Sequence, residues 1–538
     1  MAWHFGARAR ASAAALAAAG LLTACIPAIG DSGGSGGEAG GTAERAQAPD
    51  AGRGECAVKA PAGDSRQRQV RAMWIATVAG IDWPRDPKKP AAVQQAQFRK
   101  LLDTAKAMNF NAVFVQIRPN SDAFYPSPYE PWSKWLTGTP GKNPGYDVLD
   151  FMIKESHARN LEFHAWFNPY RVSRDNDLKK LAPNSPARQN PGWVRQYGTG
   201  LWYDPGLPQV RDLATKSVMD VVRKYDIDAV HFDDYFYPYP EGGRDYPDQA
   251  TFKAYGKGMS KADWRRQNVD TMVRGLAQKI GEAKPWVRFG ISPFGVWRNS
   301  TSDPSGSKTR ALQSYSDQYA DTRKWIKQGW IDYVTPQLYW PIGDPRADYA
   351  GLVGWWSREV AGTKVQLTIG QAAYRVGEDS TWKNPAELSR HLDLNKRYPA
   401  VKGDVYFSGK DLASNRRGFA ERLRKDHYAR PAIPPAAPGG KAPAPARGVT
   451  AERDGSGVKV RWQTTRDATA HAVYRVDGKR PGCAPVDAGT LLASVRGGGI
   501  VDPTAKPGAT YTYYVTALDR LHHESAPSRG ATVTVRGG

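Results

Sequence analysis

Short apolar runs alternate with longer amphipathic stretches along the middle of the chain. The apolar runs are each short enough to form one strand, and they cover residues 70–78, 111–118, 161–168, 227–234, 287–294, 331–340, 364–372 and 403–409. The amphipathic stretches have helical spacing, and they cover residues 93–108, 146–159, 208–224, 262–283, 315–328, 349–360, 385–396 and 411–424. Continuous apolar runs are typical of parallel strands that are buried on both faces. Eight strands alternating with eight helices predict an α/β fold, a (β/α)₈ or TIM barrel.

A doubly wound open sheet is the main alternative to a barrel. Such sheets often bind dinucleotides through a glycine-rich phosphate loop that follows the first strand. No such loop follows residues 70–78, and this difference favours the barrel.

The C-terminal part of the chain, residues 448–538, has a different pattern. Its segments GVKVRWQ, AHAVYRVDG, TLLASV, TYTYYVTALDR and ATVTVRG alternate apolar and polar residues at a period of two, which is typical of half-buried strands. Trp462 lies early in this part, and Tyr511, Tyr513 and Tyr514 lie in a late strand. The pattern resembles a fibronectin type III domain, a small all-β sandwich. Such modules are usually spacers or weak binding surfaces, so we expect the chemistry in the barrel.

Two segments of low complexity divide the chain into parts. Residues 26–65 are rich in Gly, Ala and Ser and should form a flexible tether. Residues 429–447 are rich in Pro, Ala and Gly and should form a semi-stiff spacer. The predicted organisation is therefore a signal peptide (1–25), the tether, a barrel (66–428), the spacer and the sandwich (448–538).

The N-terminus has the features of a secretory signal. Arg8 and Arg10 precede an apolar run, residues 11–22, that is too short to span a bilayer. The run ends in Leu-Thr-Ala-Cys, which resembles the bacterial lipobox and makes Cys25 the expected site of lipidation. An ordinary signal peptide with a chance cysteine is the alternative. We therefore expect a protein that is lipid-anchored to the cell membrane on its extracytoplasmic face.

The other two cysteines, Cys56 and Cys483, do not have the spacing of zinc ligands. A disulfide between them is compatible with an oxidising compartment. The segments that carry them need not meet, so the pairing is left open.

The composition favours a carbohydrate ligand and surroundings rich in anionic polymers. The net charge is +22, spread along the chain rather than gathered in an arm. A basic surface favours anionic polymers and lipids, and no nucleic-acid-binding signature is present, so we expect no nucleic acid partner. The chain also has 18 Trp and 25 Tyr, more than its core needs. Aromatic rings stack on the C–H faces of sugars, which suits a glycan cleft.

Polar and aromatic residues gather at the ends of the predicted strands. In a barrel, the C-terminal ends of the strands and the loops after them form the active site. The residues expected there to bind substrate are Gln116, Arg118, His164, Trp166, Asn168, Arg171, Tyr235, Gln337, Tyr339, Trp340 and Gln371.

The strongest candidate for catalysis is the segment HFDDYFYP, residues 231–238. Asp233 and Asp234 follow an apolar strand, and adjacent strand residues point to opposite faces. Glycoside hydrolysis needs one carboxylate beside the anomeric carbon and a second acid across the bond. Burial among Tyr and Phe would raise the pKa of one carboxyl toward the range of an acid catalyst. An Asp pair that caps a turn is the alternative.

Other chemistries lack their motifs. His164 and His231 lie near acids, but no His-x-His, HExxH or EF-hand spacing is present. The G-x-S-x-G elbow of a serine hydrolase is also absent. We therefore expect neither a metal nor another cofactor.

Nine motifs resemble the glycosyl-hydrolase-like family 10, which includes divisome-localised glycosyl hydrolase lipoproteins. In order, they are MWIATVAGIDWP, FVQIRPNSDAFYPSPYEPWSKWLTG, FHAWFNPYRV, LWYDPGLPQVRD, HFDDYFYP, ADWRRQNVD, FGISPFGVWRN, YADTRKWIKQGWIDYVTPQLYW and IGQAAYRVG. The resemblance covers residues 71–424. It implies a barrel that hydrolyses peptidoglycan glycan strands, with peptide-stripped strands as substrate. It also implies cell-division or wall-synthesis proteins as partners.

The second acid is the least defined part of the predicted site. Glu241 ranks first because it lies in the loop after the Asp pair, and Glu130 lies in the loop after the second strand. Glu155 lies in a predicted helix. The resemblance also points to Asp263 in ADWRR, although this residue opens a helix and a capping role is the alternative. Two other functions stay open: a lipoprotein that binds wall glycan without cleaving it, and a hydrolase of another polysaccharide.

Overall fold

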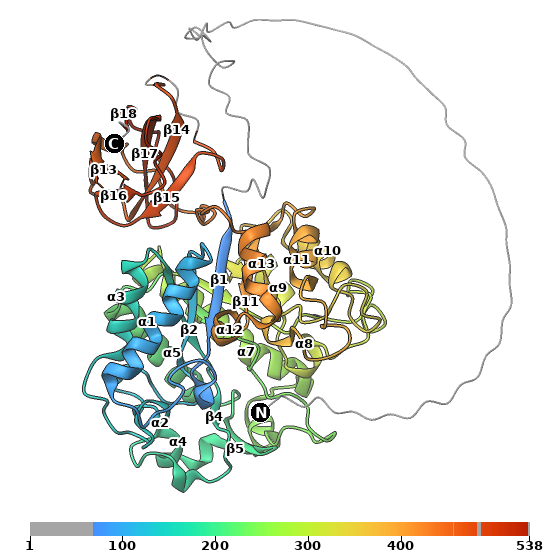
Figure 1. Cartoon of the computed structure of the whole chain (residues 1–538). Helices are drawn as coiled ribbons and strands as arrows, with labels where there is room; N and C mark the ends of the chain where they lie inside the picture. Colours follow the sequence, from blue (N-terminus) through green and yellow to red (C-terminus); the bar gives the residue numbers. More distant parts are fainter. Residues whose placement is uncertain (1–67, 456, 481, 483–485, 536–538) are drawn as a thin grey trace, which may run out of the picture. The chain divides into compact units, whose positions relative to one another are not determined.

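The computed structural model describes residues 68–455, 457–480, 482 and 486–535 (Figure 1). Eight parallel strands close into a barrel in the order β1-β11-β10-β9-β8-β7-β3-β2. Their bounds are β1 (Val70–Ile75), β2 (Ala112–Arg118), β3 (Glu162–Phe167), β7 (Ala229–Phe232), β8 (Arg288–Ile291), β9 (Tyr333–Val334), β10 (Gln366–Gln371) and β11 (Val401–Tyr406). Seven of the strands lie inside a predicted apolar run, and β11 begins two residues before its run, so the (β/α)₈ barrel is confirmed. Cys25, Cys56 and Cys483 lie outside the described residues.

Helices surround the barrel, as Figure 1 shows. The main ones are α1 (Ala91–Ala107), α3 (Val148–Ala158), α5 (Pro208–Lys224), α7 (Lys261–Ala283), α9 (Thr322–Lys327), α10 (Tyr349–Val360), α11 (Glu387–Asn395), α12 (Gly409–Ser414) and α13 (Phe419–Asp426). Short helices α2 (Lys134–Thr137), α4 (Pro186–Gln189), α6 (Gln249–Tyr255) and α8 (Ser314–Asp317) lie in the loops. The predicted helix 315–328 is broken at Tyr319, which has a φ of 55°, and the predicted helix 411–424 is broken at Asn415, which has a φ of 45°. A left-handed residue cannot continue a right-handed helix.

The barrel strands are buried on both faces, which explains their continuous apolar character. One alternating set of side chains fills the barrel interior and includes Ala72, Trp74, Phe114 and Tyr333. The other set packs against the surrounding helices in one large core. Because both sets are apolar, the sequence of each strand shows no period of two.

A small antiparallel sheet is inserted between β3 and β7. It consists of β4 (Arg171–Ser173), β6 (Gly200–Tyr203) and β5 (Val194–Tyr197), in that order. The 3₁₀ helices η2 (Leu178–Lys180) and η3 (Pro191–Trp193) lie in the same insertion. The insertion begins where β3 ends, so it rises from the end of the barrel where the predicted site lies.

The C-terminal part is a sandwich of two antiparallel sheets. One sheet has the order β12-β13-β16 and the other β15-β14-β17-β18. The bounds are β12 (Arg447–Asp454), β13 (Gly457–Gln463), β14 (Ala470–Asp477), β15 (Leu491–Val495), β16 (Gly499–Asp502), β17 (Thr510–Leu518) and β18 (Ala531–Thr534). The Tyr511 hydroxyl accepts a hydrogen bond from the Lys506 backbone N–H at 3.2 Å, which forms a tyrosine corner. The fibronectin type III-like fold is confirmed, with β12 and β16 missed by the sequence pattern.

The first part of the predicted spacer 429–447 is packed, since residues 432–435 are buried, whereas residues 438–442 are exposed. Ile433 is fully buried, and its carbonyl accepts from the Gln69 backbone N–H at 2.9 Å. The Asn111 side chain donates to the Ala432 carbonyl at 3.1 Å. Proline removes a backbone donor but leaves the carbonyl acceptors. In this segment the carbonyl groups of Ala432 and Ile433 accept hydrogen bonds from Asn111 and Gln69 of the barrel.

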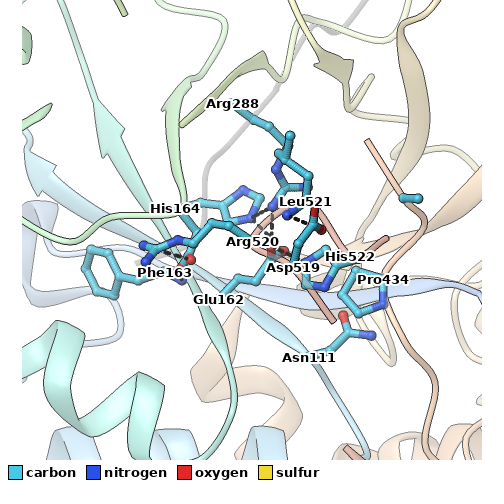
Figure 2. Close-up of polar contacts among 12 residues, drawn as sticks. Asn111, Glu162, Phe163, His164, Arg288, Pro434, Asp519, Arg520, Leu521 and His522 are labelled. Carbon is cyan, nitrogen blue, oxygen red and sulfur yellow. Dashed lines mark hydrogen bonds and ion pairs between the residues drawn. The ribbon is translucent and has the colours of Figure 1, made fainter. Parts of the chain in front are cut away.

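Charged residues join the sandwich to the end of the barrel where its strands begin (Figure 2). Glu162, the first residue of β3, is buried and contacts Arg288 in the barrel. Its partner in the sandwich is His522, whose Nε2 lies 2.7 Å from Glu162 Oε1. Arg520 of the sandwich lies 3.3 Å from the buried Asp228 carboxylate. The sandwich therefore covers acidic groups at the end of the barrel opposite the predicted site.

Within the described residues, no helix combines the length and the apolar character that crossing a bilayer requires.

Candidate active site

The Asp pair lies directly after β7, at the mouth of the barrel. Asp233 is buried, and the Asn168 side-chain N–H₂ donates to its two carboxyl oxygens at 2.7 and 2.6 Å. Burial raises the pKa of Asp233 to about 7, and the neighbouring Asp234 charge adds to the rise. Arg171 and the Asn168 hydrogen bonds act in the opposite direction. Asp233 can therefore hold a proton near neutral pH, as a general acid must.

Asp234 is buried beside it but has different partners. The Tyr239 hydroxyl donates to its carboxylate, and the Gln337 side chain is a second hydrogen-bond partner. Burial raises the pKa of Asp234, whereas these hydrogen bonds favour the ionised form. The Gln318 side chain donates to the Asp234 carbonyl at 2.7 Å and fixes the backbone. Two carboxyls in contrasting environments can take separate acid and carboxylate roles.

A hydrogen-bonded network sets the orientation of Asn168. Its Oδ1 accepts from Gln116 Nε2 at 2.5 Å and from Arg171 Nη2 at 3.2 Å. Gln116 is itself fixed, because its Oε1 accepts the Thr77 and Val78 backbone N–H groups. With the Asn168 oxygen occupied by two donors, its N–H₂ must face Asp233. Gln116, Asn168 and Arg171 therefore lie at the mouth and support the acid, and their contact with substrate stays a prediction.

Arg118 and Glu130 form a buried ion pair below this network. The Arg118 guanidinium also donates to the Asn168 and Pro169 carbonyls. Ser121 Oγ donates to Glu130 at 2.9 Å. Both side chains are occupied by this pairing, so Arg118 supports the loop after β3 rather than facing substrate. The same pairing argues against Glu130 as the second acid.

Aromatic rings line the surroundings of the Asp pair. Tyr235 stacks on Trp202 with ring centroids 6.0 Å apart, and the Arg171 guanidinium lies 4.8 Å from the Tyr235 ring centroid. The other contacts are Tyr239 with Phe294, Phe294 with Trp340, and Tyr339 with Tyr374. Tyr235, Tyr339 and Trp340 are thus placed as expected. Rings in this arrangement can bind the apolar faces of sugars.

Several residues of this site were missed by the sequence reasoning. Tyr239 lies only a few positions after the Asp pair, in the run YFYPYP, so its distance along the chain could have identified it. Trp202 comes from β6 of the inserted sheet and Gln318 from the loop after α8, and neither had a local signal. Phe294 and Tyr374 follow β8 and β10, and the strand-end argument could have included them.

Two predicted substrate contacts on β3, His164 and Trp166, lie deeper in the barrel than the mouth. His164 is buried in the barrel interior, where it contacts the Tyr333 hydroxyl at 2.9 Å and Glu162 at 3.3 Å. It precedes Asn168 by four residues, which places it roughly 13 Å deeper along the strand. Trp166 lies two residues before Asn168, at the next position that faces the barrel interior, and its side chain is almost wholly buried. Counting alternate residues identified the correct face of β3 but not the depth of each residue.

Gln371 points out of the barrel, which corrects its assignment as a substrate contact. Its Nε2 donates to the Tyr349 hydroxyl and to Asp404, each at 2.8 Å, and its Oε1 lies 2.9 Å from His391 Nδ1. The neighbouring Gly370 faces inward, because a side chain there would meet Trp74. Gln371 therefore joins β10 to helices α10 and α11.

The remaining acids are not joined to the Asp pair by any hydrogen bond or ion pair within the described ranges. Glu241 is half exposed, its backbone N–H donates to Tyr197, and its carboxylate lies 3.9 Å from Arg244. Glu155 pairs with Arg99 and Arg159 on the outer surface. Glu241 as second acid stays a prediction.

Asp263 lies in the first turn of α7. Its backbone N–H donates to Ser260, the N-cap residue, and its carboxylate pairs with Arg266. These contacts give Asp263 a capping role. Elsewhere in the described part of the chain, no three His, Cys, Asp or Glu side chains are grouped so that they could hold a metal ion.

Comparisons with known proteins identify a family and several similar chains. A family profile described as glycosyl hydrolase-like 10 matches residues 69–386. Glycosyl hydrolase YngK of Bacillus subtilis (strain 168) is 48% identical over 483 residues, 86% of this chain and 93% of that protein. Glycosyl hydrolase DigH of Escherichia coli (strain K12) is 41% identical over 374 residues, 65% of this chain and 85% of that protein. The PgaB (BpsB) glycoside hydrolase domain from Bordetella bronchiseptica covers 66% of this chain and 98% of its own at 14% identity, with a TM-score of 0.46.

Proposed function

Because this chain belongs to the glycosyl hydrolase-like 10 family and is a glycoside hydrolase, we propose that it cleaves peptidoglycan glycan strands from which the peptides have been removed. Removing a peptide turns the lactyl amide of the wall sugar into a free carboxylate. The stripped strand is therefore a polyanion, and the net charge of +22 favours such a substrate. The aromatic rings around Asp233 suit the sugar faces.

The proposed mechanism divides acid and carboxylate roles between Asp233 and Asp234. Asp233 donates its proton to the glycosidic oxygen as the bond to the anomeric carbon breaks. The Asp234 carboxylate stabilises the positive charge that develops on the sugar ring. Water then adds its oxygen to the anomeric carbon and gives up a proton, so that both carboxyls return to their starting states.

One observation carries this proposal. Asp233 is a buried carboxyl with a pKa of about 7, held by the oriented Asn168 amide at the mouth of the barrel. A carboxyl that only capped a turn would need neither the burial nor the network of Gln116, Asn168 and Arg171.

The proposal includes a place in the cell. Cys25 would carry a lipid that anchors the chain to the extracytoplasmic face of the cell membrane, within reach of the wall. Cell-division or wall-synthesis proteins would then be its neighbours and partners.

Incubation with purified, amidase-treated wall glycan tests the activity. New reducing ends that increase with time would support the proposal. Glycan bound and recovered intact would favour a binding lipoprotein instead. Cleavage of an unrelated polysaccharide, with wall glycan left intact, would favour the third function.

A further inference from the structure

A pocket lined by two tryptophans and basic side chains lies in the loops after β2 and β3, at the same end of the barrel as the Asp pair. Among its lining residues are Asn120, Trp132, Lys134, Trp135, Arg174 and Lys180, and we call it the tryptophan pocket. It is shallow and partly open to solvent. The site derived above does not use it.

The tryptophan pocket lies at the same end of the barrel as Asp233. Its lining comes from the loops after β2 and β3, and β3 is the neighbour of β7 in the barrel. A hydrogen-bonded chain joins the two places: Asn120 Oδ1 accepts from Arg171 Nε at 3.1 Å, and Arg171 binds Asn168, which holds Asp233. The pocket and Asp233 therefore belong to one hydrogen-bonded part of the barrel mouth.

The charges of the tryptophan pocket favour an anion. The Lys134 ammonium lies 5.0 Å from the Trp135 ring centroid, so one sugar could contact both a cation and an indole. Arg174 is exposed, and its charge also acts on Tyr235 beside the Asp pair. Lys180 is paired with Asp175 at 2.6 Å and contributes less.

One acid also lines the tryptophan pocket. Asp122 Oδ1 accepts the Asn120 backbone N–H at 3.1 Å. Burial raises the pKa of Asp122 to about 6, which reduces the negative charge that the pocket holds in mildly acidic solution. The lining thus carries three basic side chains, Lys134, Arg174 and Lys180, and one acid, Asp122.

We propose that the tryptophan pocket is a subsite for a sugar that carries a free carboxylate, such as the lactyl carboxylate of a peptide-stripped wall sugar. Lys134 and Arg174 bind the carboxylate, and the indoles bind the apolar face of the ring. The inference rests on the proposed function and adds a reason for the choice of stripped strands. A strand that keeps its peptides presents an amide without charge at this position.

The test uses two soluble glycans: amidase-treated strands with free lactyl carboxylates, and the same strands with those carboxylates converted to methyl amides. The double variant Lys134→Gln/Arg174→Gln should raise KM for the free-carboxylate strands about fivefold, the scale of partly exposed charge contacts. The kcat, and the KM for the neutralised strands, should stay unchanged. Lys179→Gln is the matched control, because Lys179 is exposed next to Lys180 but does not line the pocket.

Binding measured with the full-length Asp233→Asn variant separates this inference from the proposed function. Preferential binding of the free-carboxylate strands, lost on adding Lys134→Gln/Arg174→Gln, would support the subsite even if the wild type cleaved neither glycan. Trp132→Ala should weaken binding of both glycans alike, because stacking does not depend on the carboxylate. Equal affinity for both glycans before and after the lysine and arginine changes would overturn the subsite.

Discussion

At the scale of single residues, the site depends on how one amide is oriented. Asn168 offers both a donor and an acceptor, and the two donors on its oxygen leave its N–H₂ for Asp233. A carboxyl that is buried without such a partner would be held neutral over the whole working range. Burial and the amide together place the pKa of Asp233 near neutrality, where an acid catalyst is most effective.

The first prediction concerns the charge and the proton of Asp233. Asp233→Asn keeps the shape of the side chain but cannot donate the proton, so kcat should fall by about a hundredfold or more. Asp234→Asn should also slow turnover, because it removes the carboxylate that stabilises the transition state. KM for both variants should stay within about twofold. Asp263→Asn is the control, and full activity in both pair variants would refute the assignment.

The second prediction concerns pH. The unfolded Asp233 carboxyl titrates near 3.8 and the folded one near 7. Stability from this group is therefore fully present below pH 3.8 and is lost as the pH rises toward about 7. Asp233→Asn removes that loss, so its melting temperature relative to wild type should rise between pH 4 and pH 8. A difference that stays constant over this range, measured by calorimetry, would contradict the raised pKa.

At the scale of elements, the end of a strand decides which residues reach the mouth. β7 ends at Phe232, so Asp233 and Asp234 are free of the sheet and both find partners at the mouth. β10 continues through Gln371, and this residue keeps the outward direction that its place in the strand gives. A polar residue at the end of a strand can therefore face the mouth or a covering helix, depending on where the strand stops.

The third prediction tests the outward position of Gln371. Gln371→Ala removes one hydrogen-bond partner each from His391, Asp404 and Tyr349, which should lower the free energy of unfolding by about 1–3 kcal/mol. KM for glycan should not change, because the side chain does not face the mouth. Gln366→Ala, at the other and more exposed end of β10, is the matched control for denaturant unfolding. An unchanged stability with a raised KM would restore Gln371 as a substrate contact.

At the scale of the whole molecule, the sandwich is more than an appended module. Its His522 and Arg520 contact Glu162 and Asp228 at the barrel end away from the Asp pair. Buried carboxylates that lose a cationic partner are costly. The sandwich should therefore contribute to the stability of the barrel while leaving the mouth unaffected.

The fourth prediction concerns removal of the sandwich. A chain that ends at Pro434 should still fold, since the barrel has its own core. Its melting temperature should fall by several degrees, because Glu162 loses His522 and Asp228 loses Arg520. Turnover of short glycans should be retained, while binding to whole walls should weaken. Arg520→Ala in the full chain should reproduce part of the loss, and an unchanged melting temperature in both would show that the contacts add no stability.

The fifth prediction concerns the anchor. Cys25→Ala removes the thiol that a lipid requires, so the variant should be released from the membrane or left unprocessed. Fractionation of cells followed by detection of the chain measures this outcome. Identical membrane association of variant and wild type would contradict the lipid anchor. A variant that is cleaved and secreted would instead be consistent with it.

The sequence by itself determined the features that follow from local periodicity. Apolar runs of strand length, separated by helical spacing, specified the (β/α)₈ barrel, and alternation at a period of two specified the sandwich. The position of Asp233 and Asp234 followed from the rule that barrel sites lie where strands end. These inferences need only neighbouring residues along the chain.

Only the tertiary structure decided which side chains meet. The sequence allowed Glu130 as the second acid, but in the structure it forms an ion pair with Arg118. The sequence also allowed His164 and Gln371 as substrate contacts, but His164 lies deep in the barrel interior and Gln371 points out of the barrel. The proline-rich segment resembled a spacer until Ile433 proved to be buried. Side-chain pairing, depth along a barrel strand and burial of a linker all depend on residues far apart in the sequence. A periodic pattern records which face is apolar, but not which partner from another element covers it.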